Sequence, residues 1–153
     1  MKRPDQGLVT LEFAMVSAVF LLLFFTVLEM GRLLFVWNSL SEATRRGARI
    51  AIVCPPSHPS VIDVTLFNAP GNHASNSSLV HGLSRNMVSV DYPVIYGTPM
   101  VRVAISGYIH TLLLPLPEAY RMLEAPGFVT ILPSESMGAL PDPSGGTGTN
   151  ECP

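Results

Sequence analysis

One hydrophobic pattern runs through the first third of the chain. The stretch from Leu8 to Leu28 is almost entirely apolar and holds about 21 residues, close to the roughly 20 that cross a hydrocarbon core. Beyond it, apolar and small residues recur at steps of three and four. This pattern predicts a single helix from about Val9 to Val53. Pro55 follows directly, and the residue before a proline is pushed out of the helical region, so we expect the helix to end there.

We divide the predicted helix into a transmembrane part, residues 8–37, and an amphipathic stalk, residues 38–54. Glu29 and Arg32 stand three positions apart near the outer end of the apolar run, where they can pair locally or reach the membrane interface. Small and apolar residues mark one face of the stalk, which we expect to pack on a partner helix or on the chain's own sheet. This face comprises Leu40, Ala43, Gly47 and Ala51.

Two segments after the helix alternate between apolar and polar residues, as half-buried strands do. They are Met87–Tyr92 and Met100–Ser106, and their short connection predicts an antiparallel hairpin. Gly127–Pro133 is a plausible third strand. Between the helix and the first strand the chain is rich in Pro, Ser, Asn, His and Gly, so we expect irregular structure with one brief helix near Val61–Phe67.

The predicted fold class is therefore α+β: a long N-terminal transmembrane and stalk helix followed by a small antiparallel β-sheet domain. The small domain covers residues 55–140. Its apolar stretch 109–123 is broken by prolines, and we predict no helix or strand there. Residues 141–153 have the composition of a flexible tail.

Composition and motifs argue against catalysis. The net charge of −2 gives no reason to expect nucleic-acid binding, and the three arginines at positions 45, 46 and 49 are typical of a solvated helix face. The four histidines, at positions 58, 73, 81 and 110, have no metal-ligand spacing and are interpreted as polar loop residues. No serine stands in a nucleophile motif. We expect no enzyme activity, metal, cofactor or small-molecule substrate.

The two cysteines, Cys54 and Cys152, lie on either side of the whole region beyond the helix. In an oxidising compartment they can pair, and closing so long a loop stabilises a fold by about 4–5 kcal/mol in the chain-entropy model. The alternative is two unpaired thiols, one at a helix end and one on the tail. We favour the pair.

Glu12 is the single acid near the start of the apolar run. A carboxylate at the head of a membrane helix costs a few kcal/mol unless it finds a partner, so it is a functional hypothesis by default. The alternative is an interfacial acid that reaches water. A cleaved secretory signal is disfavoured because the run is long and no A-x-A site follows Leu28.

The order of features in the first third resembles the TadE-like pseudopilins of the bacterial tight-adherence (Flp-type) pilus system. It begins with a basic leader, Gly7, five residues to Glu12, and an aromatic residue at Phe13. It continues with an acid and a Gly-Arg pair at Glu29 to Arg32, then with further residues along the helix. These are Phe35, Trp37, Asn38, Ala43 and Gly47 to Arg49.

The resemblance implies that residues 1–7 are a prepilin leader and that a prepilin peptidase cuts between Gly7 and Leu8. Glu12 and Phe13 would then be the fifth and sixth residues of the mature chain. The new amine of a neighbouring subunit could neutralise Glu12 in a helix bundle. The implied partners are the peptidase, other pseudopilins, pilus-platform membrane proteins and the lipid bilayer.

The implied location is the inner (cytoplasmic) membrane, single-pass, with the C-terminal domain extracytoplasmic. Charge alone leaves the orientation open, because Lys2 and Arg3 precede the span while four arginines follow it. The chain is expected to act as a structural component in pilus assembly or initiation. The alternative is an uncleaved bitopic anchor whose outer domain binds a ligand or scaffolds an envelope complex.

Overall fold

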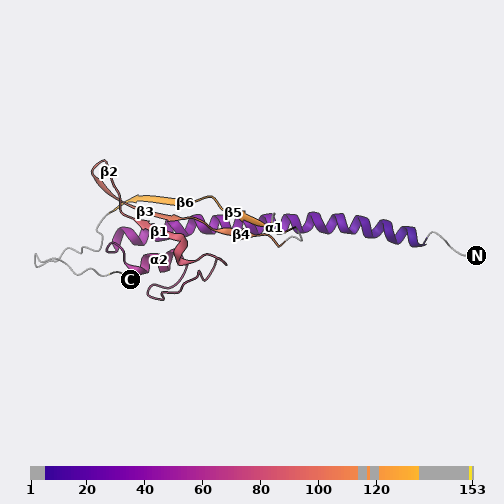
Figure 1. The fold of residues 1–153 in the computed structure, drawn as a ribbon, viewed down its shortest axis with the longest axis horizontal. Coiled ribbons are helices and arrows are strands. Elements are labelled where there is room, and N and C mark those ends of the chain that lie inside the picture. The colour runs from indigo at the N-terminus through magenta and orange to yellow at the C-terminus, as the bar shows by residue number, and fades with distance from the viewer. Residues whose placement is uncertain (1–5, 114–116, 118–120, 135–151, 153) are drawn as a thin grey trace, which may run out of the picture.

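A single long helix dominates the structure, a computed structural model that describes residues 6–113, 117, 121–134 and 152 (Figure 1). Helix α1 spans Gln6–Val53, 48 residues, and confirms the predicted helix. It ends where Cys54 N donates to the carbonyl oxygen of Ile50 at 3.0 Å, because two prolines follow. Most of the predicted leader, and all of the predicted tail except Cys152, lie outside the described residues.

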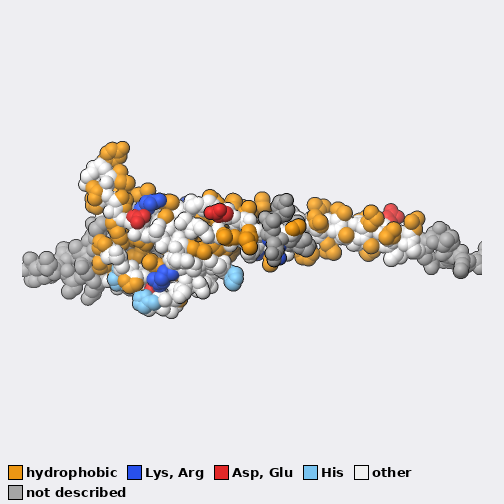
Figure 2. Space-filling model, viewed as in Figure 1, with side chains coloured by type: hydrophobic (Ala, Val, Ile, Leu, Met, Phe, Trp, Pro, Cys, Tyr) orange, Lys and Arg blue, Asp and Glu red, His pale blue; other side chains and the backbone are white. Residues whose placement is uncertain are grey.

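The two halves of α1 have opposite surroundings. The large apolar side chains from Leu8 to Leu28 are 48–72% exposed, and Figure 2 shows them as hydrophobic surface along the projecting rod. In the described residues, α1 is the one helix long and apolar enough to cross a membrane. The second half instead forms the core of a head: Leu40, Ala43 and Ala51 have no exposed surface. The head is made by everything that packs around this half.

Helix α2, Pro59–Thr65, lies against α1 and is the brief helix that the sequence predicted. Pro59 suits the first helical position because its missing N–H would have no partner there. The side chain of His58 caps the helix: its Nδ1 accepts from the backbone N–H of Ser60 at 3.3 Å. These local signals start a helix that is too short to be stable alone.

The main sheet has β3 at its centre. Strand β3, Thr98–Ile105, pairs antiparallel with β1, Val88–Asp91, on one side and with β6, Phe128–Pro133, on the other. The predicted hairpin and third strand are thus confirmed, together with the α+β fold class. The sheet covers one side of the stalk half of α1 (Figure 1).

A short ribbon extends the hairpin beyond the body of the head. Strand β2, Val94–Ile95, pairs with the start of β3, and Figure 1 shows this ribbon projecting at the end far from the N-terminus. The turn residues Tyr96 and Gly97 both have positive φ, 51° and 78°, as the tight two-residue hairpin turns require. Tyr96 is fully exposed.

A second, two-stranded sheet was not predicted. Strands β4, Ile109–Thr111, and β5, Met122–Glu124, pair antiparallel within the stretch that the sequence analysis left without an element. Each strand has only three residues, too few for alternation to reveal it. This β4–β5 hairpin lies beside the middle of α1 rather than with the main sheet (Figure 1).

Candidate functional site

The predicted processing and assembly residues lie on the exposed rod. Leu8 and Phe13 expose 68% and 72% of their surface, and Glu12 is also exposed. A Cβ on Gly7 would meet no atom within 4 Å, so the helix leaves open space around it. This end of α1 is therefore accessible. The described residues of the head bury none of the four predicted positions, which are Gly7, Leu8, Glu12 and Phe13.

The predicted stalk face is covered by the chain's own head. Leu40, Ala43, Gly47 and Ala51 are all buried, and this half of α1 packs against α2, β3 and β6. At Gly47, α1 approaches two neighbours closely: a Cβ there would lie 3.2 Å from the Cβ of Thr65 and 3.3 Å from Cγ1 of Val103. This glycine allows α1, α2 and β3 to meet at one point.

Glu29 and Arg32 form the local pair that the sequence suggested, and β4 joins it. Arg32 donates from Nε to Oε1 of Glu29 at 3.2 Å and also from Nη2 to the same oxygen. Its Nη2 donates in addition to the carbonyl oxygen of Thr111, 79 residues away in the sequence. One guanidinium group thus ties the outer end of the apolar run to the β4–β5 hairpin.

His110 completes this cluster from the helix-facing side of β4. Its side chain is 1% exposed, and Nε2 lies 3.4 Å from Oε1 of Glu29, which is itself 7% exposed. The interpretation of His110 as a polar loop histidine was wrong, because three-residue strands leave no readable pattern. Burial, and next the positive charge of Arg32, lower the pKa of His110 below 6.5 against the attraction of Glu29.

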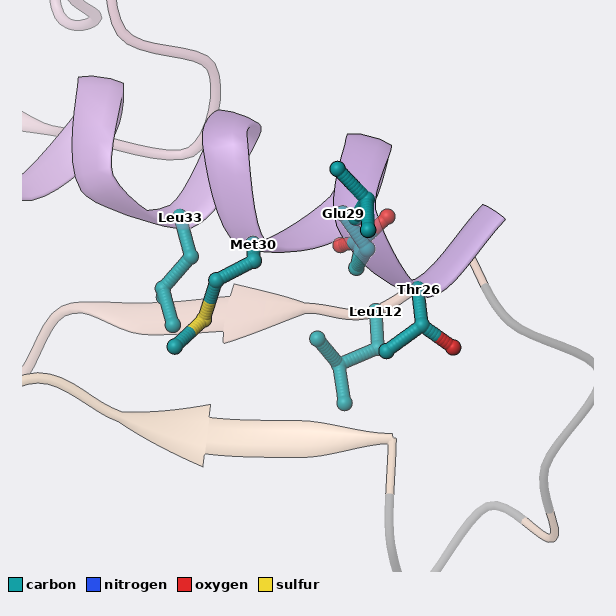
Figure 3. Close-up of a pocket in the computed structure, with 6 residues that line it drawn as sticks. Thr26, Glu29, Met30, Leu33 and Leu112 are labelled. Carbon is teal, nitrogen blue, oxygen red and sulfur yellow. The ribbon is translucent and has the colours of Figure 1, made fainter. Parts of the chain in front are cut away.

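Two cavities lie along the same stretch of α1. A polar one of about 200 Å³ lies among Arg32, His81, Tyr108 and His110, and the Tyr108 hydroxyl donates to the carbonyl oxygen of His81 at 3.0 Å. Burial raises the pKa of Tyr108. The other, of about 350 Å³, is lined mainly by apolar side chains, and Figure 3 shows its walls on α1 and at the end of β4. Its lining residues are Thr26, Val27, Glu29, Met30, Leu33 and Leu112.

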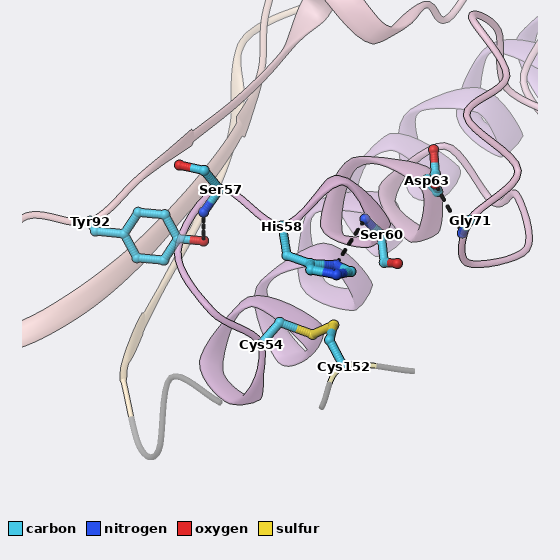
Figure 4. The surroundings of a disulfide bond; sticks show 8 residues. All are labelled: Cys54, Ser57, His58, Ser60, Asp63, Gly71, Tyr92 and Cys152. Carbon is cyan, nitrogen blue, oxygen red and sulfur yellow. Dashed lines mark hydrogen bonds between the residues drawn. A yellow bond between two sulfur atoms is a disulfide. The ribbon is translucent and has the colours of Figure 1, made fainter. Parts of the chain in front are cut away.

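Cys54 and Cys152 are joined by a disulfide, with their Cα atoms 5.1 Å apart (Figure 4). His58 lies beside them, and its ring nitrogen and the two sulfur atoms are within 4.8 Å of one another. A metal would need both sulfurs as thiolates, and the bond between them removes that possibility. The His58 ring is also engaged as the α2 cap. The arrangement fastens the tail end to the end of α1.

A largely buried ion pair, which no sequence motif indicates, holds the segment after α2. Asp63 has no exposed surface and pairs with Arg85, while its Oδ2 accepts from the N–H of Gly71 at 3.1 Å. His73 Nδ1 lies 3.4 Å from the same oxygen. No motif surrounds these residues, because the pair forms across 22 positions. Its role is to fix a segment with little regular structure.

Taken together, the polar clusters among the described side chains anchor one element to another. Each buried acid has a basic partner and each of the polar clusters joins two elements. The chemistry available is packing, ion pairing and a covalent clamp, all acting on one long helix.

Comparison with protein families identifies part of the chain. The family model described as TadE-like protein matches residues 7–49, from the glycine of the predicted processing site to four residues before the end of α1. No curated protein and no solved structure matches the chain. The head beyond α1 is thus outside the matched segment. Over residues 7–49 the resemblance predicted from the sequence is confirmed, and the chain is similar to the TadE-like family of Tad pilus-associated proteins.

Proposed function

We propose that this chain is a membrane-anchored, non-enzymatic pseudopilin that acts in assembly or initiation of a tight-adherence (Flp-type) pilus. The observation that supports the proposal is that the two halves of α1 have different roles. Its first half presents a prepilin-like signal and bare apolar surface, and its second half is the core of a compact head. Such a helix can enter a bundle of similar helices while the head stays outside the bilayer.

The span that this proposal assigns is shorter than the transmembrane part expected from the sequence. Leu33 and Val36, which lie within residues 8–37, are no more than 9% exposed and pack under the head. We therefore place the span at about Leu8–Leu28, which is still long enough to cross a hydrocarbon core of about 30 Å. Residues from Glu29 onward then belong to the head and the interface.

Processing after Gly7 is the step that separates the two candidate functions. In cells that contain a prepilin peptidase, we expect a mature chain that begins at Leu8, measured by N-terminal sequencing and intact mass. Gly7→Val should leave the precursor uncut, while Gly31→Val, at a glycine of the same helix with equally open surroundings, should be cut normally. An intact N-terminus in the unmodified protein would favour the uncleaved bitopic anchor instead.

Assembly is tested separately from processing. Glu12→Gln should be cleaved but should fail to support piliation, because the carboxylate would no longer attract a neighbouring N-terminal amine at membrane depth. Glu42→Gln is the matched control, since Glu42 is an exposed acid on the stalk half of the same helix. Normal piliation with Glu12→Gln would exclude the proposed assembly role. The partners in this proposal are other pseudopilins and platform membrane proteins.

An extracytoplasmic head is supported by the disulfide between Cys54 and Cys152, since such bonds persist in oxidising compartments. Alkaline phosphatase fused near residue 140 should be active in cells. A fusion that is well expressed but inactive would place the head in the cytoplasm and reverse the orientation.

A further inference from the structure

We propose that the tip of the β4–β5 hairpin is a second membrane contact, which docks on the surface of the lipid leaflet beside α1. The hairpin tip is defined here by its described residues Leu112, Leu113, Arg121 and Met122. This inference rests on the proposed membrane span and adds to it a lipid-facing surface on the head.

The tip is apolar and exposed although it belongs to a head with a buried core. Leu113 and Met122 expose 73% and 65% of their surface. The backbone N–H of Leu112 donates to the carbonyl oxygen of Arg121 at 2.8 Å, so the two arms are held together up to this point. Large apolar side chains held in water by a fixed backbone indicate a contact surface.

The position of the tip along α1 places it at the level of the membrane. Leu112 lines the same apolar cavity as Thr26 and Val27, which lie inside the apolar run that ends at Leu28 (Figure 3). Leu112, at the base of the tip, therefore adjoins the exposed apolar surface of the rod. If lipid covers the rod up to Leu28, the same lipid reaches the cavity and the tip.

The charges around the tip suit lipid headgroups. Arg32 lies four residues beyond Leu28, about 6 Å along the helix axis. The headgroup layer on one side of a bilayer is about 5–7 Å thick, so Arg32 falls within it. Arg121 adds a second cation on the tip, where its Nε lies 3.4 Å from the carbonyl oxygen of Leu112. Cations just above apolar side chains are typical of surfaces that lie in the membrane interface.

The Glu29–Arg32–His110 cluster holds the hairpin in this position. Arg32 binds Thr111 directly, and His110 is buried against α1 by the same strand. The hairpin therefore cannot swing away from the rod without exposing a buried acid and a buried histidine. This gives the head a fixed tilt and depth relative to the membrane.

The test uses the full chain in vesicles whose phospholipids carry bromine on their acyl chains, which quench tryptophan on contact. The native tryptophan is replaced by Trp37→Phe, and a reporter is introduced as Leu113→Trp. We expect its emission to be blue-shifted and to lose intensity relative to vesicles of unbrominated lipid. Tyr96→Trp, a fully exposed position on the β2 ribbon at the far end of the head, should keep its emission. Phe20→Trp, in the middle of the rod, reports on insertion of the span.

Each outcome decides between the alternatives. Quenching at both Phe20→Trp and Leu113→Trp, without quenching at Tyr96→Trp, supports the lipid contact. Quenching at Phe20→Trp alone overturns the inference but leaves the membrane anchor intact, and a blue shift at Leu113→Trp without quenching means that protein covers the tip. An unquenched Phe20→Trp overturns the span and the inference together. If Trp37→Phe lowers the folded yield, the same reporters are measured in the parent chain as emission added to that of Trp37.

Discussion

Gly47 is the position where one methyl group tests the packing of α1 against its own head. Replacing it by Ala places a Cβ 3.2 Å from the Cβ of Thr65 and 3.3 Å from Cγ1 of Val103, and even closer to the Thr65 hydroxyl oxygen. That hydroxyl donates to the carbonyl oxygen of Val61 at 2.7 Å, so it cannot rotate away without losing a buried hydrogen bond. The neighbours on two sides, α2 and β3, would both have to shift.

The expected effect is a balance of two terms. Overpacking a close-packed core costs about 1–3 kcal/mol. Alanine in place of glycine within a helix stabilises that helix by about 1 kcal/mol. We therefore expect Gly47→Ala to lower the free energy of unfolding of the head by up to about 2 kcal/mol, and the loss of the Thr65 hydrogen bond would add about 1 kcal/mol. For a domain of this size, each kcal/mol shifts the melting temperature by about 4–8 °C.

The assay is thermal unfolding of the full chain in detergent micelles, followed by Trp37 fluorescence with the disulfide intact. Gly31→Ala is the matched control, because a Cβ there meets nothing within 4 Å and should leave the melting temperature unchanged or slightly raised. Adding Thr65→Ala to Gly47→Ala should restore part of the loss by removing the hydroxyl oxygen. If Gly47→Ala melts at or above Gly31→Ala, the close approach of α1, α2 and β3 is refuted.

Three further predictions concern the clusters that hold the head together. Because the pKa of His110 is lower in the folded chain than the unfolded value of 6.5, the unfolded chain binds its proton preferentially. The head should therefore lose stability as the pH falls below about 6.5, and His110→Phe should flatten this dependence in unfolding curves recorded from pH 8 to pH 5; an unchanged slope would contradict the burial of the ring. Cys152→Ser should lower the free energy of urea unfolding by about 4–5 kcal/mol, as should reduction of the parent chain, and the two together should cost no more than one alone. Asp63→Asn should destabilise the head by about 1.5–3 kcal/mol, because it removes the charged acceptor of Arg85, whose side chain is 29% exposed and can still reach water. Asp91→Asn, in an exposed pair, should cost less than about 1 kcal/mol, and similar losses in the two variants would argue against a buried pair.

The prediction of α1 is confirmed because the signals for a helix lie within the helical segment itself. Apolar spacing and the absence of proline from Gly7 to Val53 indicate a helix without reference to any other part of the chain. The same holds for β1 and β3, whose alternation is readable over four to eight residues. The TadE-like resemblance also lies within this readable part.

The candidate site was predicted only in part. Glu29 and Arg32 are neighbours on one helix, so their pairing follows from spacing alone. His110 reaches the same pair from a three-residue strand almost eighty positions away, and Asp63 meets Arg85 across a segment with no motif. Contacts of this kind depend on how distant segments of the chain fold back onto α1. The spacing of residues in a single sequence does not contain that information.

The sequence by itself determined the elements whose pattern repeats over several residues: the apolar run, its extension into a stalk, and the strands of the main sheet. Only the tertiary structure decided which partner covers the stalk face, that Gly47 is a contact point, and that β4 closes over Glu29 at the end of the run. The physical reason is that periodicity reports which side of an element is buried. What buries that side is set by long-range packing, in which the entropy of closing a loop is offset by contacts that exist only once the fold is formed.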